Sequence, residues 1–429
     1  MYSQINQKAP FGWLVFATYI IFLILLPSGS IYGINVKIIA FVLLVLVAAL
    51  LIAQERYAAA HFSFAAAVIT VLGAWTVFSL INTFYSPYAF MEAKDVLTTL
   101  AGCWFIRFFA SRECDRKKFI RLCLYGVAFG CVIKVLILMY ALTSGVAVSA
   151  IIQHISAAFG VTLMTIEFGD LGGRLQFGSD NLLPICLFVM IGLRKQLSIR
   201  ALPGVVMVAL FVFSSLYTFS RFIWLSSLLA VAMGMLMGRR DKIVYGYIAI
   251  LGAVTAYFFP LLSTVIAFRF STSLAGSSDI ERDQQIPALK ELFWRSPLFG
   301  NGLGSYALQL KRSGDVPYAY EVQVLAILAQ VGLIGSGLLL FLLVNYYRKA
   351  FCLGPKPSGV QIAIFFLLLD ILGAGFFNPS LLSSMSAVGY GLLFVLAITD
   401  FKSEDANGFS RRPETPFTKP AHPAELASA

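Results

Sequence analysis

Three arginines in polar segments are the strongest candidates for binding a charged group. Arg174, Arg221 and Arg282 lie far apart in the chain, each in or beside a polar segment that interrupts long apolar runs. A guanidinium group binds phosphate oxygens through paired hydrogen bonds. If the three side chains lie on one face of the protein, they could converge on a phosphate-bearing group. The alternative is that each arginine pairs with a nearby carboxylate or with a lipid headgroup.

Glu321 is the candidate proton acceptor, because it stands with Tyr320 where a polar segment gives way to an apolar run. A carboxylate at such a place can accept the proton of an attacking hydroxyl group. It can equally cap the helix that it opens, because the positive end of the helix dipole favours negative charge. His154, in an amphipathic stretch earlier in the chain, is a weaker candidate for the same role.

The sequence offers no metal site and no nucleotide-binding loop. It contains three histidines, and no spacing of cysteine and histidine suits zinc. The run from Gly300 to Gly304 is similar to a phosphate-binding loop, but it lacks the following Lys–Ser/Thr pair and a preceding strand. We therefore expect no metal and no cofactor.

Composition indicates where these residues must be positioned. With 59% hydrophobic and 12% charged residues, the chain has too little polar surface to cover a soluble globule. Apolar runs of about 17 to 25 residues, long enough to cross a bilayer, recur along it. We predict an all-α, polytopic membrane protein with about twelve transmembrane helices. The predicted spans lie near 11–28, 38–53, 62–83, 96–110, 119–142, 181–193, 201–217, 222–237, 243–262, 321–345, 360–377 and 383–399.

Lysines and arginines cluster in connections that follow every second span, and such connections stay in the cytoplasm. Both termini are therefore expected in the cytoplasm, with loops at about 143–180 and 263–320 on the opposite face. We expect residues 1–400 to form one membrane domain and 401–429 a disordered cytoplasmic tail. The same bias, with contact to anionic lipids, explains the net charge of +11, so nucleic-acid binding is not predicted. The basic connections are 112–118, 194–200, 239–242 and 348–356.

Two ionisable residues, Lys134 and Asp370, fall within predicted spans. Each would be costly alone in the membrane, so we predict an ion pair between their helices. A proton-coupled carrier or a flippase would use such a pair, which keeps transport open as an alternative function. No inverted repeat typical of carriers is visible.

Several short motifs follow one another in an order that resembles the bacterial O-antigen polymerase and O-antigen ligase superfamily. The resemblance covers roughly residues 170–345, and the hydrophobic pattern extends it over the chain. The motifs are Arg174 with Gly178 and Asn181 before a short span, Ser220-Arg221-x-x-x-Leu225, Ser277-Ser278-x-x-x-Arg282, Ser296-Pro-Leu-x-Gly-x-Gly-Leu-Gly304, and Gly332-Leu-Ile-Gly335.

The resemblance implies a metal-independent, membrane-embedded glycosyltransferase of the GT-C type in the bacterial inner membrane. Its donor and acceptor would be undecaprenyl-pyrophosphate-linked oligosaccharides on the periplasmic side, and a chain-length regulator and a flippase are possible partners. Arg174 and Arg282 match arginines that hold the donor pyrophosphate, and Arg221 matches the Ser–Arg motif. We expect these residues, with Tyr320 and Asn301, to bind substrate, and Glu321 and Arg282 to act in catalysis.

The resemblance leaves two enzymes open, a polymerase of repeat units and a ligase that transfers glycan to the lipid A core. Ligases typically have a histidine shortly before the Gly-Leu-Ile-Gly span. This chain has Tyr320-Glu321 there, and no histidine occurs between His154 and His422. This departure favours the polymerase.

Overall fold

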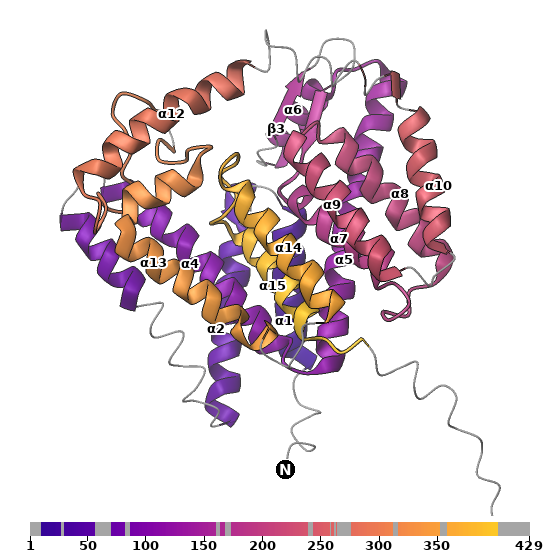
Figure 1. Cartoon of the computed structure of the whole chain (residues 1–429), viewed down its shortest axis with the longest axis horizontal. Helices are drawn as coiled ribbons and strands as arrows, with labels where there is room; N and C mark the ends of the chain where they lie inside the picture. The colour runs from indigo at the N-terminus through magenta and orange to yellow at the C-terminus, as the bar shows by residue number, and fades with distance from the viewer. Residues whose placement is uncertain are drawn as a thin grey trace, which may run out of the picture. The chain divides into compact units, whose positions relative to one another are not determined.

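The computed structural model describes residues 10–26, 30–55, 70–81, 86–159, 164–167, 173–238, 243–257, 259–260, 263, 276–311, 316–351 and 358–401. Within these ranges the chain is almost entirely helical, apart from two short antiparallel hairpins (Figure 1). The predicted all-α class is confirmed. The elements are α1 (Pro10–Leu25), β1 (Ser30–Ile31), β2 (Ile34–Asn35), α2 (Val36–Glu55), α4 (Ser86–Phe109), α5 (Glu113–Ser144), α6 (Val148–Phe159), β3 (Met164–Glu167), β4 (Gly173–Gln176), the 3-10 helix η3 (Gly178–Leu182), α7 (Leu183–Gly192), α8 (Ala201–Tyr217), α9 (Arg221–Gly238), α10 (Ile243–Tyr257), α12 (Gly276–Arg295), α13 (Gln323–Phe351), α14 (Gly359–Ala374) and α15 (Ser384–Ile398), with a further helix at Thr70–Ile81.

Four of the described helices are long and apolar enough to cross a membrane. They are Val36–Ala53, Glu113–Ser144, Arg221–Gly238 and Gln323–Arg348, and seven further apolar helices have 10–17 residues. Large apolar side chains are exposed along α2, among them Ile39, Leu46 and Leu50. Such a face would be unfavourable in water and suits lipid. The structure thus supports a membrane protein, while the number of twelve spans stays a prediction.

Helix α15 forms the centre of the helical unit. Twelve of its fifteen residues are buried, as expected for a helix that is apolar on all sides. It packs against α4, α13 and α14, and α14 in turn packs against α9 (Figure 1). Helices α7 and α9 approach closely where Gly192 faces Gly234, since a Cβ atom on Gly192 would lie 3.2 Å from the carbonyl oxygen of Gly234.

Helix ends that the sequence assigns to one membrane face contact one another. At the predicted cytoplasmic ends, Arg116 of α5 donates a 2.7 Å hydrogen bond to the carbonyl oxygen of Ile398 at the end of α15. At the predicted opposite ends, the amide of Val324 in α13 donates to the carbonyl oxygen of Gly375 after α14, at 3.1 Å. These contacts agree with the predicted alternation of helix directions. Which end faces the cytoplasm stays a prediction.

The long polar segment predicted at 263–320 is not an extended loop where the structure describes it. It contains the 20-residue helix α12, followed by a turn-rich stretch at 296–311. Helix α12 packs against α13. The segment therefore presents its polar residues from a helix, which fixes their spacing better than a loop would.

The chain divides into two compact units, Met1–Thr399 and Asp400–Ala429. The first contains every element named above. Of the second, only residues 400 and 401 are described, so the predicted tail at 401–429 lies almost wholly outside the described residues.

Candidate functional site at the start of helix α13

Arg282 and Glu321 are brought together by α12 and the segment that leads into α13. Nε of Arg282 lies 2.9 Å from Oε2 of Glu321, with side-chain exposures of 18% and 13%. The guanidinium carbon of Arg282 also lies 5.9 Å from the ring centre of Phe377, which follows α14. The arginine predicted to bind phosphate and the candidate proton acceptor, which come from two distant parts of the sequence, thus share one sheltered position.

Gln285 holds this pair in place. It lies about one turn after Arg282 on α12 and is almost completely buried. Its Oε1 accepts hydrogen bonds from the amides of Glu321, at 2.9 Å, and Val322, at 3.4 Å. Both amides lie directly before α13, which begins at Gln323. Gln285 therefore fixes the backbone that carries the Glu321 side chain, and capping of α13 by Glu321 stays an open alternative.

Tyr320 and Asn301, predicted to bind substrate, make hydrogen bonds within the protein. The hydroxyl of Tyr320 accepts from the amide of Ala307 and donates to the carbonyl oxygen of Leu310, and the side chain is 1% exposed. Nδ2 of Asn301 donates to the carbonyl oxygens of Leu292 and Ala329. Tyr320 thus joins the segment before α13 to the stretch at 307–310, and Asn301 joins the glycine-rich run to α12 and α13. Contact with substrate stays a prediction for both.

The glycine-rich run does not offer its amides to an anion. The amides of residues 300, 301 and 302 donate to the carbonyl oxygens of Ser296, Ala329 and Gln330. Those of residues 303 and 304 donate to Oγ of Ser79 and to Oε2 of Glu92. All five amides are engaged within the protein, which agrees with the sequence argument against a phosphate-binding loop.

The same run is locked to a break in α13. Gly332 has a positive φ of 68° and a ψ of −173°, which interrupts the helix. The amides of Leu333 and Ile334 donate instead to the carbonyl oxygens of Pro297 and Leu298. The Ser296–Gly304 and Gly332–Gly335 motifs are thus two halves of one interlocked structure. Irregular backbone at membrane depth requires such replacement partners.

The other predicted arginines are positioned at the ends of separate elements. Arg221 is half-buried and is the first residue of α9, after Phe219 with a positive φ of 47°. Arg174 lies on β4, where its backbone pairs with Ile166 of β3. Its side chain lies outside the described part of the structure. Convergence of all three arginines on one group therefore stays a prediction.

The predicted ion pair between Lys134 and Asp370 is wrong. Nζ of Lys134 lies 2.8 Å and 2.9 Å from the two carboxylate oxygens of Asp180 in η3, and both side chains are buried. Asp180 also accepts from the amide of Phe177. The sequence analysis assigned Asp180 to an outer loop, but η3 packs against α5 and α15 and so delivers this carboxylate to the buried lysine.

His154, the weaker candidate base, lies on α6. Its Nδ1 is 2.8 Å from the carbonyl oxygen of Ala150, one turn earlier on the same helix, and the side chain is exposed. This contact leaves Nε2 as the nitrogen facing outward. No described contact joins His154 to the Arg282–Glu321 pair.

Glu92 is a carboxylate that the sequence analysis missed. It lies on α4, one turn before the span expected at 96–110, and it lines an apolar cavity with Trp75, Leu303 and Gln330. The residue is half-buried, and its Oε2 accepts a 2.5 Å hydrogen bond from the amide of Gly304. Burial raises the pKa of Glu92 to about 8, against the opposing effect of that hydrogen bond.

Tyr318 lies in the same region and is also buried. Burial, with the neighbouring carboxylates of Asp95 and Glu92, raises the pKa of its hydroxyl group. Tyr318 therefore stays neutral at physiological pH, and it is unsuited to act as a base.

In the described ranges, no three or more histidine, cysteine, aspartate or glutamate side chains gather as a metal site would require. No family model, curated protein or solved structure matches this chain. Its function therefore has to be inferred from its residues and their geometry.

Proposed function

We propose that this protein is a metal-independent glycosyltransferase that polymerises undecaprenyl-pyrophosphate-linked oligosaccharide repeats into a surface polysaccharide. The reaction would take place at the periplasmic face of the bacterial inner membrane. The observation that carries the proposal is the Arg282–Glu321 ion pair, with 2.9 Å between Nε and Oε2. It joins the two groups that metal-free transfer from a pyrophosphate needs, a cation for the leaving group and an acceptor for a proton.

The proposed step is a single displacement at the anomeric carbon of the donor. A hydroxyl oxygen of the acceptor repeat attacks this carbon, while the bond from the carbon to the pyrophosphate oxygen breaks. The electron pair of that bond leaves with the pyrophosphate, where Arg282 stabilises the added charge. The hydroxyl proton passes to Glu321. A guanidinium group has five N–H donors, so Arg282 has donors for both the carboxylate and phosphate oxygens.

Arg174 and Arg221 are proposed as further ligands of the pyrophosphate, and Asn301 and Tyr320 as residues that fix the site. Arg221 supports this role because it opens α9, where the helix dipole also favours an anion. Lipids surround the site. A chain-length regulator and a flippase remain proposed partners.

Transport is less well supported than polymerisation. The carrier alternative depended on a pair between Lys134 and Asp370, but Lys134 forms its ion pair with Asp180. Between the two enzymes, Tyr320-Glu321 at the place of the ligase histidine supports the polymerase.

The deciding experiment is a gel of surface glycan from a strain that lacks this protein. Loss of a polymerase leaves single repeats attached to the acceptor, and plasmid-borne wild type should restore the ladder of long chains. Long chains that stay on the lipid carrier would instead identify a ligase. An unchanged ladder would reject both enzymes.

A further inference from the structure

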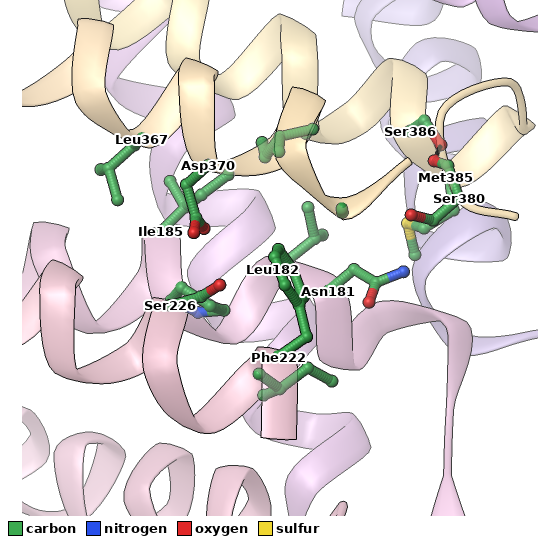
Figure 2. A pocket seen from close by; sticks show the side chains of 15 residues that line it. Asn181, Leu182, Ile185, Phe222, Ser226, Leu367, Asp370, Ser380, Met385 and Ser386 are labelled. Carbon is green, nitrogen blue, oxygen red and sulfur yellow. Dashed lines mark hydrogen bonds between the residues drawn. The ribbon is translucent and has the colours of Figure 1, made fainter. Parts of the chain in front are cut away.

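The cavity between α7, α9, α14 and α15 has too little room for a ligand much larger than water. Figure 2 shows Asp370 of α14 and Ser226 of α9 facing each other across it, and the hydroxyl group of Ser226 interacts with the carboxyl group of Asp370. The rest of its lining is mostly apolar. The end of α12, by contrast, presents exposed apolar side chains to a larger partner.

Three large apolar side chains are exposed where the chain leaves α12. Trp294, on the last turn of the helix, is 72% exposed, and Leu298 and Phe299, just beyond its end, are 55% and 53% exposed. They belong to the long polar segment that the sequence places outside the membrane. A group of exposed apolar side chains in such a segment marks a surface that is covered in the working protein.

This surface continues onto α13. The amides of Leu333 and Ile334 donate to the carbonyl oxygens of Pro297 and Leu298, at 2.9 Å and 3.1 Å. The side chains of Leu333 and Ile334 are exposed as well. Helix α13 is one of the four described helices that are long and apolar enough to cross a membrane. The exposed side chains after α12 therefore adjoin a face that suits lipid.

The length of α13 indicates how deep this surface lies. The candidate span of α13 ends at Arg348. Because a helix rises about 1.5 Å per residue, Gly332 lies roughly 24 Å along α13 from Arg348. The hydrocarbon core of a bilayer is about 30 Å thick. With Arg348 at the predicted cytoplasmic boundary, Gly332 and the residues bonded to its neighbours lie in the outer part of the core.

The backbone of the glycine-rich run meets the requirement for entering lipid. The amides of residues 300–304 all donate hydrogen bonds within the protein, and the carbonyl oxygens of residues 296–299 all accept them. In hydrocarbon, each unpaired backbone group would be costly because no water replaces the missing partner. A paired backbone that presents apolar side chains is therefore the combination that lipid requires, whereas a loop in water needs neither.

Basic side chains border the apolar surface. Residues 288–311 contain four charged side chains, three of them basic: Lys290, Glu291, Arg295 and Lys311. Glu291 accepts from Arg295 at 2.7 Å and from Gln309 at 3.0 Å, which brings the stretch that ends at Lys311 to the last turns of α12. Lys290 and Lys311 are exposed. Tryptophan and basic side chains at the rim of an apolar surface favour phospholipid, and anionic headgroups in particular.

We propose that residues 294–299 form a membrane anchor in the outer leaflet. Leu298 and Phe299 insert among the acyl chains of phospholipids, and Trp294 lies at the level of the headgroups. Lys290 and Lys311 contact anionic headgroups. The polar helix α12 thus stands with its C-terminal end in the bilayer. This inference does not depend on the transfer reaction, because it rests on exposure, backbone pairing and charge.

The test uses the full-length protein in nanodiscs that contain equal amounts of phosphatidylcholine and phosphatidylglycerol. The photoreactive residue benzoylphenylalanine takes the place of Phe299, and mass spectrometry identifies what it captures on illumination. We expect adducts to the acyl chains of phospholipids, with phosphatidylglycerol enriched. Adding Lys290→Gln and Lys311→Gln should lower that enrichment at least about 5-fold. Gln284, which is exposed on the same helix, is the matched control position and should give no acyl-chain adduct.

The natural side chain of Trp294 provides a second measurement without the probe. The difference in fluorescence between wild type and Trp294→Phe isolates the emission of Trp294. Lipids brominated near the headgroup end of their acyl chains should quench this emission, and acrylamide dissolved in the water should not.

Several results would overturn the anchor. These are capture of a second copy of the chain at position 299, no lipid adduct there, equal acyl-chain capture at positions 284 and 299, and quenching of Trp294 by acrylamide but not by the brominated lipids. Equal capture of the two phospholipids at position 299 would refute the contact of Lys290 and Lys311 with anionic headgroups. None of these measurements requires polymer formation, so the anchor can fail while the polymerase stands, and the reverse.

Discussion

Reversing the charges of the Arg282–Glu321 pair separates chemistry from structural support. The double variant Arg282→Glu/Glu321→Arg keeps an ion pair at this place but exchanges its ends. If the pair serves only to hold α12 against α13, the exchanged pair should restore both protein abundance and polymer. If Arg282 binds pyrophosphate and Glu321 accepts the proton, abundance should return and polymer should not.

The structure sets the expected magnitudes. With side chains only 18% and 13% exposed, removing one partner leaves a poorly hydrated charge and should cost about 1–3 kcal/mol of stability. The exchanged pair should recover most of the stability that is lost when one partner is removed. It should remain about 0.3–1 kcal/mol less stable than wild type, because an arginine beside the N-terminus of α13 opposes the helix dipole. Loss of a general base lowers turnover about 10²- to 10⁴-fold. The two effects are therefore easily distinguished.

The assay combines thermal unfolding of the purified variants with gels of surface glycan from the deletion strain. Glu321→Gln is the companion variant, because it keeps the size of the side chain and an acceptor oxygen. We expect normal abundance and almost no long chains from it. Wild-type polymer from Glu321→Gln, or from the exchanged pair, would refute the assignment of Glu321 as the base.

Four further outcomes are expected. Cysteine placed at Ser278 should react with a membrane-impermeant thiol reagent added from the periplasm, whereas Cys114 should not, and the reverse pattern would overturn the orientation. Polymer formation in membranes should survive EDTA, and a loss restored by Mg²⁺ or Mn²⁺ would show that carboxylates act as metal ligands. The pKa of Glu92 is about 8 in the folded protein and about 4.5 in the unfolded chain, so the stabilisation from its protonated form is lost as the pH rises through this window. Glu92→Gln should therefore flatten the dependence of the unfolding temperature on pH between about 5 and 9. Parallel curves for wild type and variant would contradict the raised pKa of Glu92. Gly332→Ala should sharply lower abundance, because its Cβ would lie 2.4 Å from backbone atoms of residues 298 and 300, whereas Gly337→Ala, which meets nothing within 4 Å, should be tolerated.

Much of the fold could be predicted because membrane helices have a local signal. Apolar length alone located helices such as α2, α5 and α13. The orientation of their ends, which rests on the bias of basic residues, stays a prediction. The helix α12 was missed, since it is polar and contains Pro287. Its stability comes from packing on α13, which no local pattern reveals.

The candidate site was predictable only in part, for a similar reason. Arg282 could be selected as an arginine of a polar segment predicted on the outer face and as part of the Ser277-Ser278-x-x-x-Arg282 motif, and Glu321 because it stands where a polar segment gives way to an apolar run. Their supports, Gln285 and Phe377, are ordinary residues whose importance depends on which helices are neighbours. The error over Lys134 has the same origin, because apolar periodicity shows that a helix is buried but does not show which carboxylate lies beside it.

The interlock between the glycine-rich run and the broken turn of α13 explains how the polar helix α12 holds Arg282 in a fixed position. Helix α12 ends at Arg295, directly before the run that donates to and accepts from the backbone around Gly332. Gln285 ties the middle of the same helix to the first amides before α13. Two separate attachments to α13 therefore limit both translation and rotation of α12. A single attachment would let the helix pivot, and displacements of about 1 Å are enough to impair catalysis. The glycines are needed because any side chain at Gly300 or Gly332 would push the two backbones apart, so these motifs fix the position of α12 and, through it, of Arg282.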